Sequence, residues 1–356
     1  MKLFLTGKKQ VGKSTAIQCF LKESGLRPGG FFTSFEETED KRILHMSSMG
    51  EELKIAVAIG DFHSMQALPG AFYHAAKDLL SNRGDLLVMD ELGYLEKDDE
   101  MFREAVFRAL DEKGPLLGVL REGFPGWTAE IAARADVEII TVTEENRDEI
   151  PLAIKSRFLN IGLSAVVMAA GRSLRFGSNK LTAPVEGLPM IERLFQNLPA
   201  TLLQKIVVVA RDTQVLKLAE HYGFATVLND DLENDPALTI RLGMETVEKD
   251  SKGCLFLVGD QPWLSKKTIL RLGDSFLKKP GYIHVPVNRE GKRGNPVFFP
   301  EKVFCELKKL PPYHRGKTVI GSHPEIVIEQ EVESLEPSDV DYSSDLKCSA
   351  NNDCAL

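Results

Sequence analysis

The stretch KLFLTGKKQVGKSTAIQCF, residues 2–20, determines the fold of the first half of the chain. An apolar run precedes a glycine-bearing loop, and residues with helical spacing follow it. Residues 7–14 fit the pattern G-x-x-x-x-G-K-[ST] in full. In such a loop the backbone N–H groups turn toward phosphate oxygens, and the start of the helix adds positive potential. The stretch therefore predicts a strand–loop–helix unit that holds a triphosphate.

The side chains of this loop have expected roles. Gly7 and Gly12 allow the backbone to curl, and Thr15 is included among the nucleotide-binding residues. We expect Lys13 to reach the β- and γ-phosphates and Ser14 to supply an oxygen ligand to Mg²⁺. The alternative is a chance glycine loop between a strand and a helix.

A loop of this kind needs a second metal partner at the end of another buried strand. DLLVMDEL, residues 85–92, brings Asp90 and Glu91 to such a strand end. We expect Asp90 to bind in the Mg²⁺ shell and Glu91 to orient or deprotonate an attacking water. A solvated Asp-Glu turn is the alternative.

A second glycine-bearing loop, AVVMAAGRSLRFGSNKL, occupies residues 165–181. Its glycines do not fit GxGxxG, but Arg175 and Lys180 lie among them, where two cations can stabilise a departing pyrophosphate. Another apolar strand, in GCLFLVGDQPWL (253–264), ends at Asp260. The pair suits Mg²⁺-dependent attack at an α-phosphate, with Arg175, Lys180 and Asp260 as catalytic residues. A basic surface loop and a simple Gly-Asp turn are the alternatives.

Strand-like and helix-like runs alternate along the whole chain, which is typical of three-layer α/β architecture. A chain of 356 residues exceeds one usual core, so we expect two domains, at residues 1–160 and 161–346, and a flexible tail at 347–356. The first should carry a hairpin made of KRILHMS (41–47) and LKIAVAI (53–59). A helix that begins near Glu144 should close it.

Composition narrows the function classes. A net charge of −8 argues against a general nucleic-acid binder. The apolar run that follows Met1 is too short for a signal peptide or a membrane span, so we expect a cytoplasmic protein. The five cysteines form no CxxC pair and suit reduced thiols. Cys348 and Cys354 lie in a polar tail, which favours a frayed terminus over a metal site.

The first half resembles the nucleoside-triphosphatase family first described from thermophiles. The resemblance is carried by the phosphate loop together with GGFFTS (29–34), MDELGYLE (89–96), FREAVFRAL (102–110) and VTEENRD (142–148). It implies slow, broad-specificity hydrolysis of ATP, GTP and other NTPs to NDPs on a RecA-like sheet. Asn146 and Arg147 match the family's Asn-Arg-Asp segment and either face the nucleotide or start a helix. Leu95 stands where the family usually has methionine.

The second half resembles the MobA-like nucleotidyltransferases, most closely the molybdenum-cofactor cytidylyltransferase branch. The matching pieces are MAAGRSLRFGSNKL (168–181), VLND (227–230), TIRLG (239–243), FLVGDQPWL (256–264), RGNPVFF (293–299) and SDVDYSSDL (338–346). The resemblance implies a Rossmann-like α/β/α domain that uses Mg²⁺. Such an enzyme moves a nucleotidyl group from an NTP, here CTP, to a terminal phosphate and releases pyrophosphate. The implied acceptor is molybdopterin or molybdenum cofactor, and a molybdenum hydroxylase apoenzyme is an implied partner.

The resemblance also assigns roles to particular residues. It implies that Gly171, Ser173, Arg175 and Lys180 bind the triphosphate and that Asp260 and Asp341 bind the metal. It implies that Ala169 and Ala170 contact the base and that Thr239 and Arg241 orient the nucleotide. The implied acceptor side is formed by Arg293, Gly294, Asn295 and Pro296. Without the resemblance, the acidic segment around Asp341 reads as a solvated turn.

Three departures from the family pattern concern the substrate rather than the phosphate chemistry. PYHRGKTVI (312–320) replaces a Gly-Asp-x-Gly-Gly segment, Asp235 stands at an expected glycine, and Tyr342 replaces a threonine. They leave three alternatives open: GTP as the donor, a sugar phosphate or another phosphorylated alcohol as the acceptor, and an NTP-gated maturation chaperone that binds cofactor without transfer.

Overall fold

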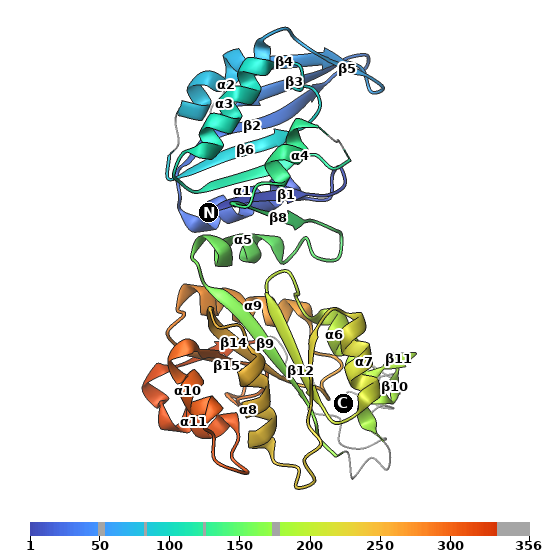
Figure 1. The fold of residues 1–356 in the computed structure, drawn as a ribbon, viewed down its shortest axis with the longest axis vertical. Helices are drawn as coiled ribbons and strands as arrows, with labels where there is room; N and C mark the ends of the chain where they lie inside the picture. Colours follow the sequence, from blue (N-terminus) through green and yellow to red (C-terminus); the bar gives the residue numbers. More distant parts are fainter. Residues whose placement is uncertain (49–53, 82–83, 124–125, 173–178, 333–356) are drawn as a thin grey trace. The chain divides into compact units, whose positions relative to one another are not determined.

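A computed structural model describes residues 1–48, 54–81, 84–123, 126–172 and 179–332. The chain separates into two compact units, Met1–Phe158 and Leu159–Leu356, and each is described by itself. Both units combine a largely parallel sheet with helices (Figure 1), which confirms the predicted α/β class with two domains. Among the helices of the described residues, none has the length and apolar character needed to cross a membrane.

The first unit is built on a sheet that has eight strands within the described residues. The strands are β1 (Lys2–Thr6), β2 (Pro28–Glu37), β3 (Arg42–Ser47), β4 (Ile55–Gly60), β5 (Met65–Ala67), β6 (Leu86–Leu92), β7 (Leu116–Leu120) and β8 (Val137–Thr141). Their order is β5-β4-β3-β2-β6-β7-β1-β8, in which β2, β6, β7, β1 and β8 are parallel. The antiparallel pairing of β3 with β4 confirms the predicted hairpin.

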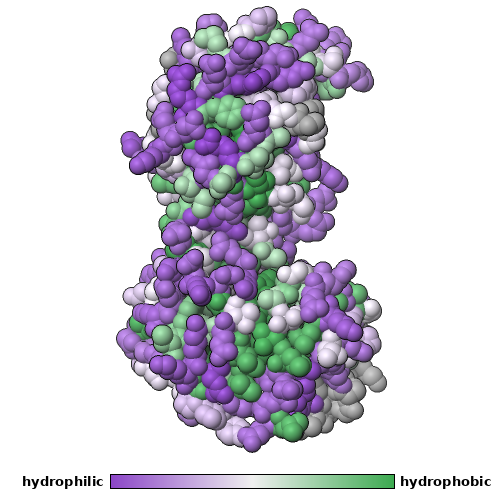
Figure 2. Space-filling model, viewed as in Figure 1, coloured by the Kyte–Doolittle hydropathy of each residue, from purple (hydrophilic) through white to green (hydrophobic). Residues whose placement is uncertain are grey.

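Helices cover both faces of this sheet. They are α1 (Lys13–Ser24), α2 (Ala71–Ser81), α3 (Glu100–Asp111), α4 (Trp127–Ala132) and α5 (Ile150–Phe158). Apolar residues of α1 and α5 pack with one face, and those of α2, α3 and α4 pack with the other. In Figure 2 hydrophilic residues, in purple, cover most of the visible face of this unit, in keeping with apolar cores on both sides of the sheet.

The helix expected to begin near Glu144 begins instead at Ile150. The Asn146 side chain accepts a hydrogen bond from the Thr143 N–H at 2.7 Å and donates one to the Thr141 carbonyl at 2.9 Å. Asparagine side chains that bond to nearby backbone compete with helical hydrogen bonds. The prediction of the helix start was therefore wrong by about one and a half turns.

The second unit has a mixed sheet and a small antiparallel pair. Its strands are β9 (Gly162–Ala169), β10 (Pro184–Val185), β11 (Leu188–Pro189), β12 (Lys205–Ala210), β13 (Ala225–Leu228), β14 (Ser251–Val258), β15 (Ile283–Val287), β16 (Val297–Pro300) and β17 (Val327–Glu331). The main sheet has the order β13-β12-β9-β14-β16-β15-β17, and β10 pairs with β11. Strand β16 runs antiparallel to both of its neighbours, whereas the other pairs of the main sheet are parallel.

Helices also flank the sheet of the second unit. They are α6 (Met190–Asn197), α7 (Thr213–His221), α8 (Pro236–Thr246), α9 (Lys266–Lys278), α10 (Phe304–Lys308) and α11 (Gly316–Ser322). Apolar residues of α8, α10 and α11 share one core with β9, β12 and β14. On the opposite face, Phe276 of α9 stacks on Phe298 of β16 with ring centroids 5.0 Å apart. The carboxyl ends of β9 and β14 meet at one edge, because Val258 pairs with Met168.

Candidate functional site

The first phosphate loop joins β1 to α1 and requires glycine at two positions. Gly7 has φ of +130°, and a Cβ there would lie 2.3 Å from the Val142 carbonyl oxygen. Gly12 has φ of +113° and precedes the first residue of α1. Both conformations are unfavourable for residues with a side chain. The backbone therefore has the curl that the motif predicts.

The lysine and serine of this loop are held by definite partners. The Lys13 side chain is buried, and its ammonium donates to the carbonyls of Gly7 at 2.8 Å and Lys8 at 2.9 Å. The Ser14 hydroxyl donates to Asp90 Oδ1 at 3.1 Å. Thr15 lies exposed on the first turn of α1. Ser14 and Asp90, the two predicted metal ligands, are thus adjacent although they are far apart in sequence.

Strand β6 carries both predicted carboxylates at its end. Burial raises the pKa of Asp90 to about 6, an effect that the Ser14 hydrogen bond opposes. Glu91 is partly exposed, and its Oε1 lies 3.7 Å from an Arg121 guanidinium nitrogen. The adjacent serine hydroxyl and carboxylate fit Mg²⁺, which typically takes one or two protein oxygens together with substrate phosphates and water.

The turn after β6 is held by a third carboxyl group, to which the sequence motifs assign no role. Glu96 is buried and accepts a hydrogen bond from the Gly93 N–H, while the Trp127 indole N–H donates to the Gly93 carbonyl at 2.9 Å. Burial raises the pKa of Glu96 to about 7. These contacts fix the turn directly after Glu91.

Asn146 and Arg147 lie in the turn that follows β8. The Asn146 side chain bonds to the backbone of this turn. Arg147 lies beside the phosphate loop, since its Cβ is 4.0 Å from the position that a Cβ on Gly12 would occupy. Of the two residues, Arg147 is the one adjacent to the nucleotide loop.

The second phosphate loop follows β9, and its lysine is paired with the predicted metal ligand. Lys180 begins a short 3-10 helix, and its ammonium donates to Asp260 Oδ2 at 2.5 Å. The other oxygen, Asp260 Oδ1, is buried and has no hydrogen-bond partner among the described residues. A buried carboxylate oxygen without a partner fits a cation ligand. Ser173, Arg175 and Asp341 lie outside the described residues.

A cavity of about 560 Å³ lies at the edge where the strands β9 and β14 end. It is lined by several of the predicted residues: Ala170, Gly171, Thr239, Arg293, Gly294 and Asn295. Ala169 is instead buried at the end of β9, and Lys180, Asp260, Pro296 and Arg241 are likewise not among the lining residues. The cavity thus joins the start of the phosphate loop to the predicted acceptor segment.

Arg241 has a structural partner instead of facing the cavity. Its guanidinium donates to the Leu310 carbonyl at 2.6 Å and pairs with Asp235 Oδ2 at 3.4 Å. Thr239 does line the cavity and accepts a hydrogen bond from the Asn229 amide at 2.9 Å. The orientation role assigned to Thr239 and Arg241 therefore fits the position of Thr239 and not that of Arg241.

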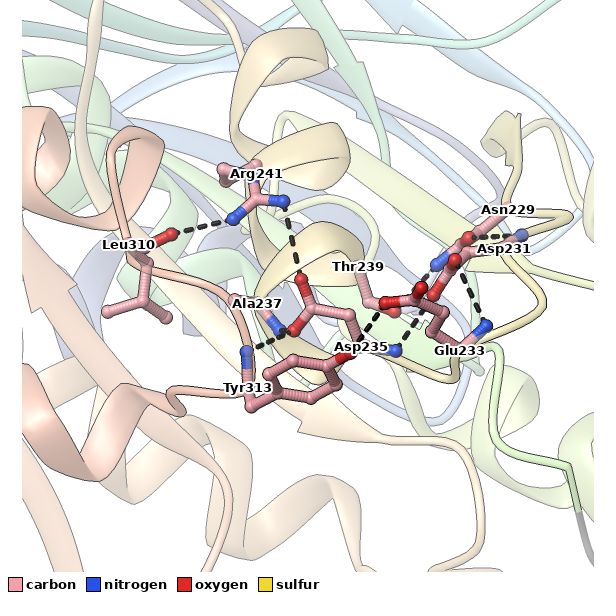
Figure 3. A network of polar contacts seen from close by, with 9 residues as sticks. All are labelled: Asn229, Asp231, Glu233, Asp235, Ala237, Thr239, Arg241, Leu310 and Tyr313. Carbon is pink, nitrogen blue, oxygen red and sulfur yellow. Dashed lines mark hydrogen bonds and ion pairs between the residues drawn. The ribbon is translucent and has the colours of Figure 1, made fainter.

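Two of the departures noted in the sequence contact each other. Asp235 caps α8 by accepting from the Ala237 N–H at 2.9 Å, and the same Oδ1 accepts from the Tyr313 N–H at 2.7 Å. Figure 3 shows Tyr313 reaching from the loop before α11 to the acidic loop before α8, where its hydroxyl donates to Glu233 at 2.5 Å. Asp231 accepts from the Asp235 N–H at 2.9 Å. Asp235 thus ties together two loops that border the cavity.

Sequence reasoning missed three cations that line this cavity. Arg211 follows β12, and Arg315 and Lys317 lie at the start of α11. These three cations outnumber the acidic lining residue Asp235, whose carboxylate already has partners, while the fourth lining cation, Arg293, is paired with Glu329 at 2.7 Å. The departure at residues 312–320 was the available signal for Arg315 and Lys317, whereas nothing local marked Arg211. The lining favours a ligand with negative charge.

Both halves of the chain match known families. Residues 2–155 match the family described as NTPase, and residues 165–327 match the MobA-like NTP transferase domain. The nucleoside-triphosphatase THEP1 of Thermotoga maritima is 30% identical over 164 residues, which are 42% of this chain and 91% of that protein.

The chain is also similar to a transferase and to a solved structure. A probable molybdenum cofactor guanylyltransferase of Aquifex aeolicus is 29% identical over 116 residues, 32% of this chain and 53% of that protein. The crystal structure of Rv0371c from Mycobacterium tuberculosis is similar with a TM-score of 0.47 and 25% identity, over 52% of this chain and 97% of that one.

The fold and the first phosphate loop define a protein of the nucleotide-binding α/β class, and the sequence of the second unit carries a further glycine-bearing loop after β9. Within that class, the chain belongs to the NTPase family through its first half, and its second half matches the MobA-like NTP transferase domain. Both suspected resemblances are thereby confirmed at the level of the family.

Proposed function

We propose that the chain is a bifunctional enzyme, with an NTPase in residues 1–160 and a nucleotidyltransferase in residues 161–346. The observation that carries the second activity is the cavity, whose lining includes both Gly171 of the phosphate loop and Arg293–Asn295 on the acceptor side. NTP substrates follow from the two families, and the specific reactions below are our inference.

In the NTPase, a water attacks the γ-phosphorus and the bond to the β-phosphate oxygen breaks. Glu91 at the end of β6 is the residue to orient that water and accept its proton. Two of the three Lys13 ammonium N–H bonds donate to loop carbonyls, and we infer that they exchange these partners for β- and γ-phosphate oxygens when the NTP binds. Ser14 and Asp90 would hold Mg²⁺, which supplies charge neutralisation when bound.

In the transferase, a phosphate oxygen of the acceptor attacks the α-phosphorus and pyrophosphate leaves. The acceptor phosphate is already an anionic nucleophile, so alignment and charge neutralisation dominate and no separate general base is required. We assign Lys180 and Arg175 to the leaving pyrophosphate, and Asp260 with Asp341 to Mg²⁺. The cations Arg293, Arg315 and Lys317 around the cavity support a phosphorylated acceptor.

For the substrates we propose CTP as the donor and molybdopterin or molybdenum cofactor as the acceptor, with delivery to a molybdenum hydroxylase apoenzyme. These choices rest on the sequence motifs of the cytidylyltransferase branch. GTP is the second candidate donor, favoured by the similarity to the Aquifex aeolicus relative, which is a probable molybdenum cofactor guanylyltransferase.

The test incubates the purified full chain with Mg²⁺, molybdopterin or molybdenum cofactor, and CTP or GTP in turn, and measures pyrophosphate and dinucleotide product. Release with CTP that depends on the acceptor supports the proposal, and release with GTP alone favours the second candidate. Acceptor-dependent release with a sugar phosphate instead of molybdopterin would change the acceptor. No pyrophosphate with any NTP, while a homologue is active in the same assay, would reject transfer. An unchanged cellular dinucleotide yield in an Asp260→Ala strain would instead favour the chaperone alternative.

A further inference from the structure

Arg121 occupies a place in the sheet of the first unit where the two parts of the NTPase site meet. Strand β7 lies between β6, which carries Asp90 and Glu91, and β1, which leads into the phosphate loop. Arg121 is the first residue after β7. Leu5 of β1 pairs with Val119 of β7 in a parallel register. Two residues further along each strand, Arg121 therefore lies level with Gly7, next to the strand that leads into the phosphate loop.

The side chain of Arg121 is held at this edge and remains about one-third exposed, at 31%. Its guanidinium lies 4.8 Å from the Tyr94 ring centroid and 3.7 Å from Glu91 Oε1. The Arg121 N–H donates to the Leu92 carbonyl at 2.9 Å, which anchors the backbone. Gly93 gives it room, because a Cβ there would lie 3.2 Å from Arg121 Cδ.

During hydrolysis, negative charge develops on the γ-phosphoryl group, and the motif supplies a cation on only one side of that group. Lys13 approaches the terminal phosphates from the loop, where it is bonded to Gly7 and Lys8. In phosphoryl transfer, negative charge spreads over the equatorial oxygens of the γ-phosphoryl group, and an arginine supplied in cis or in trans stabilises it. Planar guanidinium groups suit this role, since they bind two oxygens at once.

We propose that Arg121 is a catalytic residue of NTP hydrolysis, whose guanidinium moves from Glu91 to the γ-phosphoryl oxygens in the transition state. The inference rests on the proposed hydrolysis at the first phosphate loop. As the water oxygen bonds to the γ-phosphorus, the bond between that phosphorus and the bridging oxygen breaks and the NDP leaves. The water proton passes to the Glu91 carboxylate, which the departing guanidinium has vacated.

A purely positioning role for Arg121 predicts a different kinetic result. An arginine that only positions Glu91 would act through that carboxylate and never touch phosphate. Its removal would then have no effect once Glu91 has been replaced by glutamine. A contact with the phosphoryl group predicts a loss in both backgrounds.

The experiment uses the full chain with MgATP and no acceptor, and it measures orthophosphate release and the binding of ADP with and without fluoroaluminate. We expect Arg121→Ala to lower kcat at least about 100-fold, with ADP affinity changed less than about threefold. Fluoroaluminate should no longer tighten ADP binding. In the Glu91→Gln background the same replacement should still cost at least about tenfold.

Controls separate this inference from folding and from the proposed function itself. Arg108→Ala, on the exposed face of α3, is the matched control and should leave orthophosphate release unchanged. Guanidinium chloride at low concentration should partly restore Arg121→Ala, which a folding defect would not allow. Activity of Arg121→Ala within about threefold of the native chain, or no effect in the Glu91→Gln background, overturns the inference. No orthophosphate release by the native chain would instead reject the proposed hydrolysis.

Discussion

The two phosphate loops hold their lysines in different ways. In the first, the Lys13 ammonium donates to carbonyls of its own loop, and the nearby carboxylate of Asp90 is bonded to the Ser14 hydroxyl. In the second, Lys180 is paired directly with the carboxylate of Asp260. In the first loop the lysine and the candidate metal ligand thus have different hydrogen-bond partners, whereas in the second they are partners of each other.

This difference teaches how each loop prepares for its substrate. A lysine bonded to its own loop can stay in place when a cation approaches the carboxylate. A lysine that neutralises the carboxylate has to give up that contact before the carboxylate can bind a cation. We therefore expect the first loop to be preassembled and the second to rearrange when nucleotide binds.

The largest expected effect comes from Lys13→Ala. Loss of the cation at the preassembled loop should lower orthophosphate release by roughly 1,000-fold, while pyrophosphate release by the other domain persists. Separate assays of the two products check this, with Lys22→Ala on the exposed side of α1 as the matched control. Loss of both activities would show that the two sites do not act independently.

Asp260→Ala should produce the reverse pattern. It removes the buried oxygen that fits a cation and the carboxylate to which Lys180 donates, so pyrophosphate release should fall by roughly 100-fold. Orthophosphate release should not change. Asp250→Ala, at an exposed position before β14, serves as the control. A normal rate of acceptor-dependent pyrophosphate release in Asp260→Ala would contradict the rearrangement described above.

The pH dependence of the stability of Glu96→Gln tests the turn that follows the first loop's carboxylates. Because burial raises the pKa of Glu96 from 4.5 to about 7, the native carboxyl stabilises the fold fully below pH 4.5, and this contribution is lost as pH rises to about 7. The amide keeps an oxygen for the Gly93 N–H and cannot ionise. The stability of Glu96→Gln relative to the native chain should therefore grow by about 3 kcal/mol between pH 4.5 and 8.

Urea unfolding followed by Trp127 fluorescence, in a Trp263→Phe background, measures this difference. Glu104→Gln, on the exposed face of α3, is the control and should show no such trend. A relative stability of Glu96→Gln that is constant over this pH range would mean that Glu96 titrates normally.

The smallest effect is expected at Asp235. Alanine removes the cap of α8 and the acceptor of the Tyr313 N–H, at a cost of about 1–2 kcal/mol, whereas asparagine keeps an oxygen for both bonds; both variants lose the ion pair with Arg241. Hydrogen exchange of the α8 amides checks the ranking of the two variants. Equal protection in Asp235→Ala and the native chain would show that the link between the two cavity loops carries no stability.

Local pattern was enough to predict most of the architecture and the conformation of the first phosphate loop. The apolar run before Gly7 and the helical spacing after Ser14 are properties of adjacent residues, and they form β1 and α1 as expected. The hairpin of β3 and β4 is likewise a local pairing. The helix start near Glu144 failed because one side chain, Asn146, bonds to the turn instead.

The cations that lie outside the motifs could not be found in the same way. Arg121 is opposite Glu91 only because β7 lies beside β6, and Arg211, Arg315 and Lys317 share a cavity only through the second sheet. Each of them is an ordinary surface residue in its own stretch of sequence. Asp235 was noticed as a departure, yet its bond to Tyr313 spans 78 positions and has no local sign.

The reversed direction of β16 has a consequence for how such a domain can diversify. Residues at the carboxyl edge of a parallel strand come after the strand, but on β16 they come before it, so Arg293–Asn295 reach the edge through the β15–β16 connection. This connection can change length or sequence without altering the strand ends that carry Gly171 and Asp260. Under the proposed function, selection among acceptors would therefore be modular: an altered hairpin would retarget the enzyme, while its treatment of the triphosphate would be inherited intact.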